Sequence, residues 1–192
     1  MQFDLLFGMT NAQNAEFVVT RMTAFLESTR DEFLKRDLVA KITVLAEKFA
    51  PSHSWYIQTM NSVFERGGDL VDVAVAHNLM RLIAEGPSGD DEQDNLLRGY
   101  ACQSYLELLT KTNTPDRLIQ VGSWTLGEYA YILRPHTDLE AVIAILCDLL
   151  QRSYYKDIST KCYIVSAVSK IVAHNPTGCP GMVCTLTFPN VC

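Results

Sequence analysis

The chain has 192 residues, of which 48% are hydrophobic and 20% charged, and its formal net charge is -6. This composition is typical of a folded, soluble protein, and the acidic balance argues against a general nucleic-acid binder, which usually presents a basic face. The longest apolar run, 141–147, is far shorter than the roughly 20 residues that a bilayer-spanning helix needs. The first ten residues contain Asp4 and no basic residue, so we expect no secretory signal.

Apolar residues recur at helical spacing from just after Asn11. The first helix is expected over 12–28, and Asp31 is expected to cap a second helix that ends near Phe49. Pro51 closes this second helix, because the residue before a proline is pushed out of the α region. We expect these two helices to have the following residues on their apolar sides: Phe17, Val18, Met22, Phe25 and Leu26 in the first, and Phe33, Leu34, Leu38, Ile42, Leu45 and Ala46 in the second.

The next helix is expected over 54–66, with Ser52 and Ser54 as candidate N-caps. Gly67 and Gly68 would end it, because glycine tolerates a positive φ. Trp55, Thr59, Ser62 and Arg66 share one side of this helix, and its buried stripe is Tyr56, Ile57, Met60, Val63 and Phe64. Its partner, over 71–84, is expected to bury Val73, Val75, Leu79, Leu82 and Ile83.

Residues 86–95 are short, acidic and rich in turn formers, so we expect an exposed loop there. A third pair follows over 96–109 and 116–133, and a fourth over 137–151 and 159–173. Gly122 and Gly127 inside a helix are expected to allow close approach of a neighbouring helix, with Trp124, Tyr129 and Tyr131 packed around them.

The pairs begin roughly every 40 residues, and the chain shows no strand pattern. This period predicts an all-α fold, an α-solenoid of about four HEAT- or armadillo-like helix pairs that is a fragment of a longer trunk. The last residues, 175–192, contain three prolines, two glycines and three cysteines and do not continue the helical pattern. We therefore expect two regions, a solenoid segment over 1–174 and an irregular tail over 175–192.

The residues that carry chemistry do not form a recognisable site. Cys179, Cys184 and Cys192 lack the close pairing of zinc ligands, and only His174 lies near them. The other histidines, His53, His77 and His136, fall in different repeats, and Asp69, Asp72, Asp90, Asp91 and Asp94 do not match a calcium loop. Since no glycine loop for a nucleotide and no nucleophile motif is present either, we expect no catalytic, cofactor-binding or metal-binding residues and no enzyme activity.

Two further residue groups bear on location and surface. Cys102, Cys147 and Cys162 lie inside helical patterns, where a reduced thiol behaves as a small hydrophobe, so we expect a cytosolic protein without disulfides. Lys35, Arg36 and Lys41 form the one compact basic group. A solvated helix face explains this group, and contact with anionic lipid is the alternative.

The amino-acid sequence of several stretches resembles that of a known family. The sequence LAEKFAPSHSWYIQTMNSVFERGGD at 45–69 resembles the adaptins, in which an AEKYAP-type turn precedes a helix that contains Trp and ends at glycine. Adaptins are the large subunits of heterotetrameric adaptor complexes. The stretches at 4–19, 79–86, 98–109 and 123–133 extend the resemblance over about residues 2–174, and within the family it is greatest to the epsilon subunits of adaptor complex four.

The resemblance implies a structural and interaction role in vesicle-mediated protein transport and cargo sorting at the trans-Golgi network or endosomes. It also implies partners, namely the beta, mu and sigma subunits of the complex and an Arf-family small GTPase, and a peripheral place on the membrane. No binding residue is transferred from the family. A HEAT-repeat scaffold or soluble transport receptor unrelated to vesicle coats is the alternative function.

Overall fold

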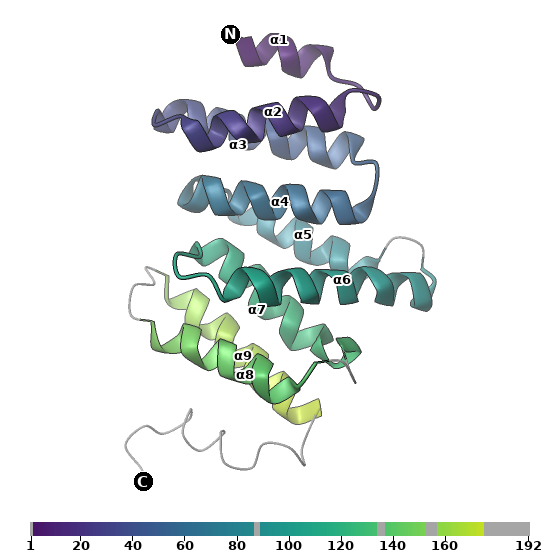
Figure 1. Ribbon diagram of the computed structural model, residues 1–192, viewed down its shortest axis with the longest axis vertical. Helices are drawn as coiled ribbons and strands as arrows, with labels where there is room; N and C mark the ends of the chain where they lie inside the picture. The colour runs from purple at the N-terminus through teal and green to yellow at the C-terminus, as the bar shows by residue number, and fades with distance from the viewer. Residues whose placement is uncertain (1, 87–88, 134–136, 153–156, 175–192) are drawn as a thin grey trace. The chain divides into compact units, whose positions relative to one another are not determined.

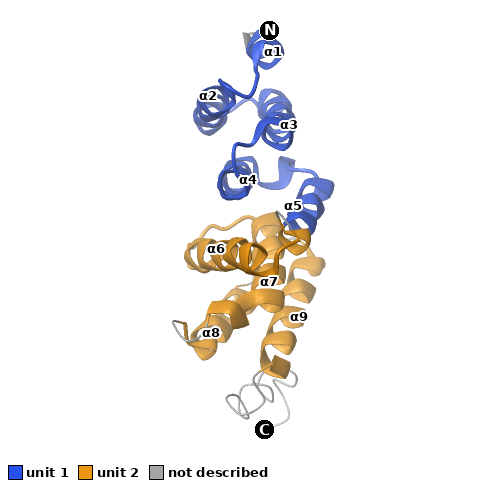
Figure 2. Ribbon diagram, turned by 90° about the vertical axis from the view of Figure 1, so that its right-hand side faces the viewer, with its two compact units in different colours: residues 1–82 blue, residues 83–192 orange. Residues whose placement is uncertain are grey.

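The computed structural model describes residues 2–86, 89–133, 137–152 and 157–174. Within these ranges the chain forms nine α-helices, two short 3-10 helices and no strand (Figure 1). The chain divides into two compact units, Met1–Leu82 and Ile83–Cys192, which Figure 2 colours separately. The predicted all-α fold class is confirmed.

Each unit contains successive helices joined by short turns. The first unit holds α1 (Gln2–Met9), α2 (Ala15–Ser28), α3 (Glu32–Phe49), α4 (His53–Gly67), the 3-10 helix η1 (Gly68–Leu70) and most of α5 (Val73–Glu85). The second unit holds the end of α5, then α6 (Asp91–Leu109), α7 (Asp116–Tyr129), the 3-10 helix η2 (Ala130–Leu133), α8 (Leu139–Gln151) and α9 (Ile158–His174).

The repeat is most regular in the second helix of each pair. These helices begin at Glu32, Val73, Asp116 and Ile158, in steps of 41, 43 and 42 residues. Aspartates stand at or just before each start, and Asp31 caps α3 by accepting from the amides of Phe33 and Leu34 at 2.9 and 3.2 Å. The expected period of about 40 residues is therefore confirmed.

The turn between α3 and α4 and the end of α4 follow the sequence prediction. Ser52, rather than Ser54, caps α4, because its hydroxyl accepts from the amide of Trp55 at 3.1 Å. Gly68 ends the helix with a φ of 53°, in the region that favours glycine. All five residues of the expected stripe are buried: Tyr56, Ile57, Met60, Val63 and Phe64.

The core of the first unit omits several residues that we expected it to contain. Phe33 is 83% exposed, because α3 buries a stripe that begins only at Leu38, and Phe33 lies about 140° around the helix from that residue. Phe17, Phe25 and Val73 are also exposed, at 64%, 38% and 38%. The phenyl rings of Phe17 and Phe25 instead lie against the Arg21 guanidinium and the Phe3 ring, respectively.

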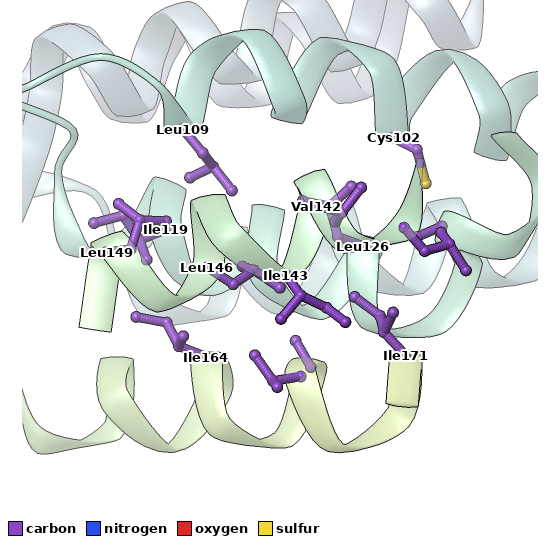
Figure 3. Close-up of a cluster of buried hydrophobic side chains, with 14 residues drawn as sticks. Cys102, Leu109, Ile119, Leu126, Val142, Ile143, Leu146, Leu149, Ile164 and Ile171 are labelled. Atoms are coloured by element: carbon purple, nitrogen blue, oxygen red, sulfur yellow. The ribbon is translucent and has the colours of Figure 1, made fainter. Parts of the chain in front are cut away.

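The core of the second unit gathers side chains from four helices. Figure 3 shows these side chains converging between α7, α8 and α9, with Cys102 and Leu109 contributed by α6. Its aliphatic members are almost entirely buried: Leu109, Ile119, Leu126, Ala130, Leu139, Val142, Ile143, Leu146, Leu149, Ile164, Ala167, Val168 and Ile171.

One expectation about local structure was wrong, and one helix was not predicted. The acidic stretch that we expected to be a loop to residue 95 forms the first turn of α6 from Asp91 onward, capped by the Asp90 carboxylate at 3.3 Å from the amide of Glu92. Carboxylates are favourable near the N-terminus of a helix, where the helix dipole is positive. A run of acidic residues therefore indicates the start of a helix as readily as a loop. The sequence interpretation also missed α1 entirely.

Gly122 and Gly127 allow close helix approach as expected, but Tyr131, which we expected to pack around them, is 46% exposed and its ring lies against His174. A Cβ on Gly127 would lie 2.7 Å from the Cα of Ala167 in α9, and one on Gly122 would lie 3.1 Å from a methyl group of Leu109 in α6. The rings of Trp124 and Tyr129 meet edge to face nearby, 5.9 Å apart. Close helix approach at these positions is confirmed.

Candidate interaction site

The metal-binding side chains of the described residues lie apart from one another. No group of three or more metal-binding side chains is present among them. His53, His77 and His174 are exposed on separate helices, whereas His136 and the cysteines at 179, 184 and 192 lie outside the described residues. A metal site in the tail therefore stays untested.

The cysteines of the helices differ in environment. Cys102 is fully buried, and burial raises the pKa of its thiol to about 12, so the reactive thiolate is suppressed at neutral pH. Its Sγ lies 3.7 Å from the carbonyl oxygen of Thr125. Cys147 is half-buried with a pKa raised by the same cause, and Cys162 is exposed. All three are free thiols.

The compact basic group predicted on α3 is partly neutralised. The Lys41 ammonium contacts the Asp4 carboxylate of α1 at 2.7 Å and also pairs with Asp37. The hydrogen bond from Lys41 is the largest of several causes that lower the pKa of Asp4, and the charge of Lys41 adds to it. Since Lys41 is occupied in this way, Lys35 and Arg36 alone would remain for an anionic surface, and the lipid-binding alternative loses its main support.

Polar contacts between helices join residues about one repeat apart. In the first unit Arg66 of α4 pairs with Glu27 of α2 at 3.1 Å. In the second unit Lys170 of α9 pairs with Glu128 of α7, and Arg152 donates to the carbonyl oxygen of Lys111 at 2.8 Å. Side chains at similar positions of neighbouring repeats thus contact one another, as in the stacked units of a solenoid.

The densest of these contacts joins the first turns of α7 and α9. Its members, called the α7–α9 polar cluster below, are Asp116, Arg117, Gln120, Asp157, Ser159 and Thr160. The Gln120 amide nitrogen donates to the Thr160 hydroxyl at 2.9 Å, and that hydroxyl donates to the Asp116 carboxylate at 3.1 Å. The same carboxylate accepts from the amide of Asp157 at 3.2 Å.

Asp157 completes the α7–α9 polar cluster from the other side. One of its carboxylate oxygens accepts from the amide of Ser159 at 2.9 Å and caps α9. The other lies 3.4 Å from both the Arg117 guanidinium and the Gln120 amide nitrogen. Hydrogen bonds from Ser159, followed by the charge of Arg117, lower the pKa of Asp157. Sequence reasoning missed this cluster, because its members are unremarkable until the two helices are set side by side.

Large apolar side chains remain exposed on several helices of both units. They are separated along the chain and are not covered by other described residues. The most exposed are Leu5 (70%) and Met9 (72%) on α1, Phe17 (64%) on α2, Phe33 (83%) on α3, Leu96 (71%) on α6 and Ile158 (80%) on α9. In the described part of the chain no helix combines the length and apolar character that crossing a bilayer requires.

Comparison with known proteins identifies relatives of this helical array. The family described as "Adaptin N terminal region" matches residues 1–187. The AP-4 complex subunit epsilon of Arabidopsis thaliana is 44% identical over 172 residues, which cover 89% of this chain and 18% of that protein. The AP-4 complex subunit epsilon-1 of Homo sapiens is also 44% identical over 172 residues, covering 88% of this chain and 15% of the relative.

A more distant relative is the AP-1 complex subunit gamma-2 of Arabidopsis thaliana, 29% identical over 184 residues that cover 91% of this chain and 20% of that subunit. The chain thus spans less than a fifth of the length of the AP-4 epsilon relatives, and its identity to them is higher than to this gamma subunit. The resemblance seen in the sequence is confirmed: the chain belongs to the adaptin family of large adaptor-complex subunits.

Proposed function

We propose that this chain is a trunk segment of an epsilon-like large subunit in a heterotetrameric adaptor complex, and that it acts in vesicle-mediated intracellular protein transport as a scaffold and not as an enzyme. The observation that carries the proposal is the array of helix pairs, held by contacts one repeat apart, in a chain 44% identical to AP-4 epsilon subunits. Stacked helix pairs provide extended surfaces that hold partners at fixed spacing.

The proposed partners are the beta, mu and sigma subunits of the complex. The exposed apolar side chains, among them Phe33 and Ile158, would be buried by such subunits, since aromatic and aliphatic anchors supply much of the affinity of protein interfaces. Peripheral recruitment to the trans-Golgi network or endosomes by an Arf-family GTPase is part of the same proposal.

Affinity purification of the full-length protein that contains this segment tests the partners. We expect beta, mu and sigma adaptor subunits to be recovered together. If the exposed apolar side chains bind these subunits, Phe33→Ser should lower their recovery. Gln103→Ser on α6 is the control and should leave the recovery unchanged. Both side chains are exposed, so neither substitution disturbs the core. Recovery of none of the three subunits would overturn the proposal, and release of soluble cargo by a GTPase would favour the receptor alternative.

Microscopy of the tagged full-length protein tests the location. We expect punctate signal that coincides with a trans-Golgi or endosomal marker and that disperses when a GDP-locked Arf protein is expressed. Uniform cytosolic signal under both conditions would contradict recruitment by Arf while leaving the assembly with adaptor subunits to be decided by the purification.

A further inference from the structure

The boundary between the two units falls inside α5, between Leu82 and Ile83. The last turn of this helix has no basic residue, and the helix ends at the acidic Glu85. The final carbonyl groups of a helix have no partner within it, and the helix dipole is negative there, so an acidic residue at this end is unfavourable. From its own sequence, the C-terminal turn of α5 is therefore expected to fray.

Arg98 of α6 supplies the charge and the donors that this turn lacks. Its Nη2 donates to the carbonyl oxygen of Ala84 at 2.7 Å, and its Nε donates to that of Ile83 at 3.4 Å. Both carbonyls belong to the last turn of α5. A guanidinium suits this role because it holds several N–H donors in a fixed planar fork and is always charged.

Neighbouring groups hold the guanidinium and the end of α5 in place. The Nη1 of Arg98 donates to the side-chain oxygen of Asn95 at 3.2 Å, and its Cζ lies 5.1 Å from the centre of the Tyr129 ring of α7, a cation–π distance. Directly after α5, Gly86 has a φ of 73°, and a Cβ on it would lie 2.2 Å from the carboxyl carbon of Asp94. Asp94 is 3% exposed and stands one turn before Arg98, so α6 meets the end of α5 at two successive turns.

We propose that Arg98 is a coupling residue, which makes residues 83–85 open together with α6 and α7 and not with the rest of α5. Without its contacts these residues would fray by local opening of the helix end. Since α5 begins in the first unit and ends in the second, Arg98 then sets how far an opening of the second unit extends into the helix that the two units share. The proposal concerns the chain alone and does not depend on its assembly with partners.

Native-state hydrogen–deuterium exchange of the 192-residue chain, read residue by residue, tests the coupling. Val142→Ala opens a cavity in the core that α8 shares with α6, α7 and α9, so it should accelerate exchange in the second unit. If Arg98 couples the end of α5 to this unit, the amides of residues 83–85 should accelerate by the same factor as those of α6 and α7. Ile42→Ala, in the core of the first unit, should leave residues 83–85 unchanged.

Variants of Arg98 test the residue itself. In Arg98→Gln, which removes the charge and the fork, we expect residues 83–85 to exchange about tenfold faster or more, as for the loss of a hydrogen bond to a charged group, and α6 and α7 to change by a smaller factor. Adding Val142→Ala to Arg98→Gln should no longer accelerate residues 83–85, because local fraying would then dominate their exchange.

Two further variants complete the comparison. Arg98→Lys keeps the charge but not the fork, so exchange of residues 83–85 should lie between that of Arg98→Gln and that of the parent chain. If Arg98→Gln does not fold, Arg98→Lys carries the same test. Arg81→Gln is the matched control, because Arg81 is an exposed arginine of α5, and it should leave residues 83–85 unchanged.

Three results would contradict the coupling. Unchanged exchange of residues 83–85 in both Arg98→Gln and Arg98→Lys would show that the end of α5 does not need Arg98. Equal acceleration of residues 83–85, α6 and α7 in Arg98→Gln would show that Arg98 stabilises the second unit as a whole. Acceleration of residues 83–85 by Ile42→Ala but not by Val142→Ala would show that the end of α5 opens with the first unit.

Discussion

Ser123 illustrates how a single buried group limits the stability of α7. Its hydroxyl oxygen is buried and has no hydrogen-bond partner among the described residues. Because an unpaired buried hydroxyl costs about 1–3 kcal/mol, we expect Ser123→Ala to raise the free energy of unfolding by about 1 kcal/mol. Urea denaturation followed by circular dichroism measures the change.

The control for Ser123 is Ser166→Ala on the exposed side of α9, which reports only the higher helix propensity of alanine. The gain in Ser123→Ala should exceed the gain in Ser166→Ala. A loss of stability in Ser123→Ala would mean that the hydroxyl is paired in solution.

Asp157 makes the stability of the second unit depend on pH in the acidic range. Its pKa is lowered in the folded chain from the usual 3.8, so the folded state binds this proton more weakly than the unfolded state does. The stabilisation is therefore complete above pH 3.8 and is lost as the pH falls below it. We expect the urea midpoint of the parent chain to drop between pH 5 and pH 3, and to drop less in Asp157→Asn.

Asp4 has a lowered pKa of about 2 and contributes in the same direction, so Asp157→Asn should reduce the acid sensitivity without abolishing it. Glu107→Gln, at an exposed position of α6 in the same unit, serves as the control and should follow the parent chain. Equal acid sensitivity in Asp157→Asn and the parent would contradict the role of the Asp157 carboxylate.

At the scale of helices, glycine decides how closely α7 and α9 pack. A Cβ on Gly127 would collide with the backbone of Ala167 at 2.7 Å, so Gly127→Ala should lower the free energy of unfolding by about 1–3 kcal/mol. Gly99→Ala in α6 is the matched control, because the nearest atom to its added Cβ, a methyl carbon of Ile132, is 3.7 Å away.

Gly99→Ala should stabilise the chain by about 0.5–1 kcal/mol, since alanine favours a helix interior over glycine. Opposite signs for the two substitutions, read from the same denaturation experiment, are the expected result. Stabilisation by Gly127→Ala would mean that α9 does not approach α7 as closely as described.

The sequence predicts helix ends and core residues well where a residue type has a single structural role. Pro51 and Gly68 mark helix ends, and the helix periods place most of the core. Prediction fails where a residue type serves two structures: Phe33 is apolar yet exposed, and the acidic residues from Asp91 start a helix instead of extending a loop. The α7–α9 polar cluster could not be predicted, because it requires the alignment of residues that lie about one repeat apart in the sequence.

At the scale of the whole molecule, contacts between neighbouring repeats imply that disturbances stay local. The inter-helix ion pairs and hydrogen bonds described above join helices of adjacent pairs, and the chain divides into two compact units. In such arrays stability is close to a sum of repeat terms and nearest-neighbour terms. A cavity in the first unit should therefore leave the second unit largely protected.

Ile42→Ala tests this expectation, because Ile42 is fully buried in α3 and its truncation should cost about 2–5 kcal/mol locally. In hydrogen–deuterium exchange we expect amides of α2 and α3 to exchange faster, while those of α7, α8 and α9 change little. Val142→Ala in α8 should produce the converse pattern. Equal acceleration throughout the described helices in both variants would show that the two units unfold as one and that a disturbance in one unit reaches the other.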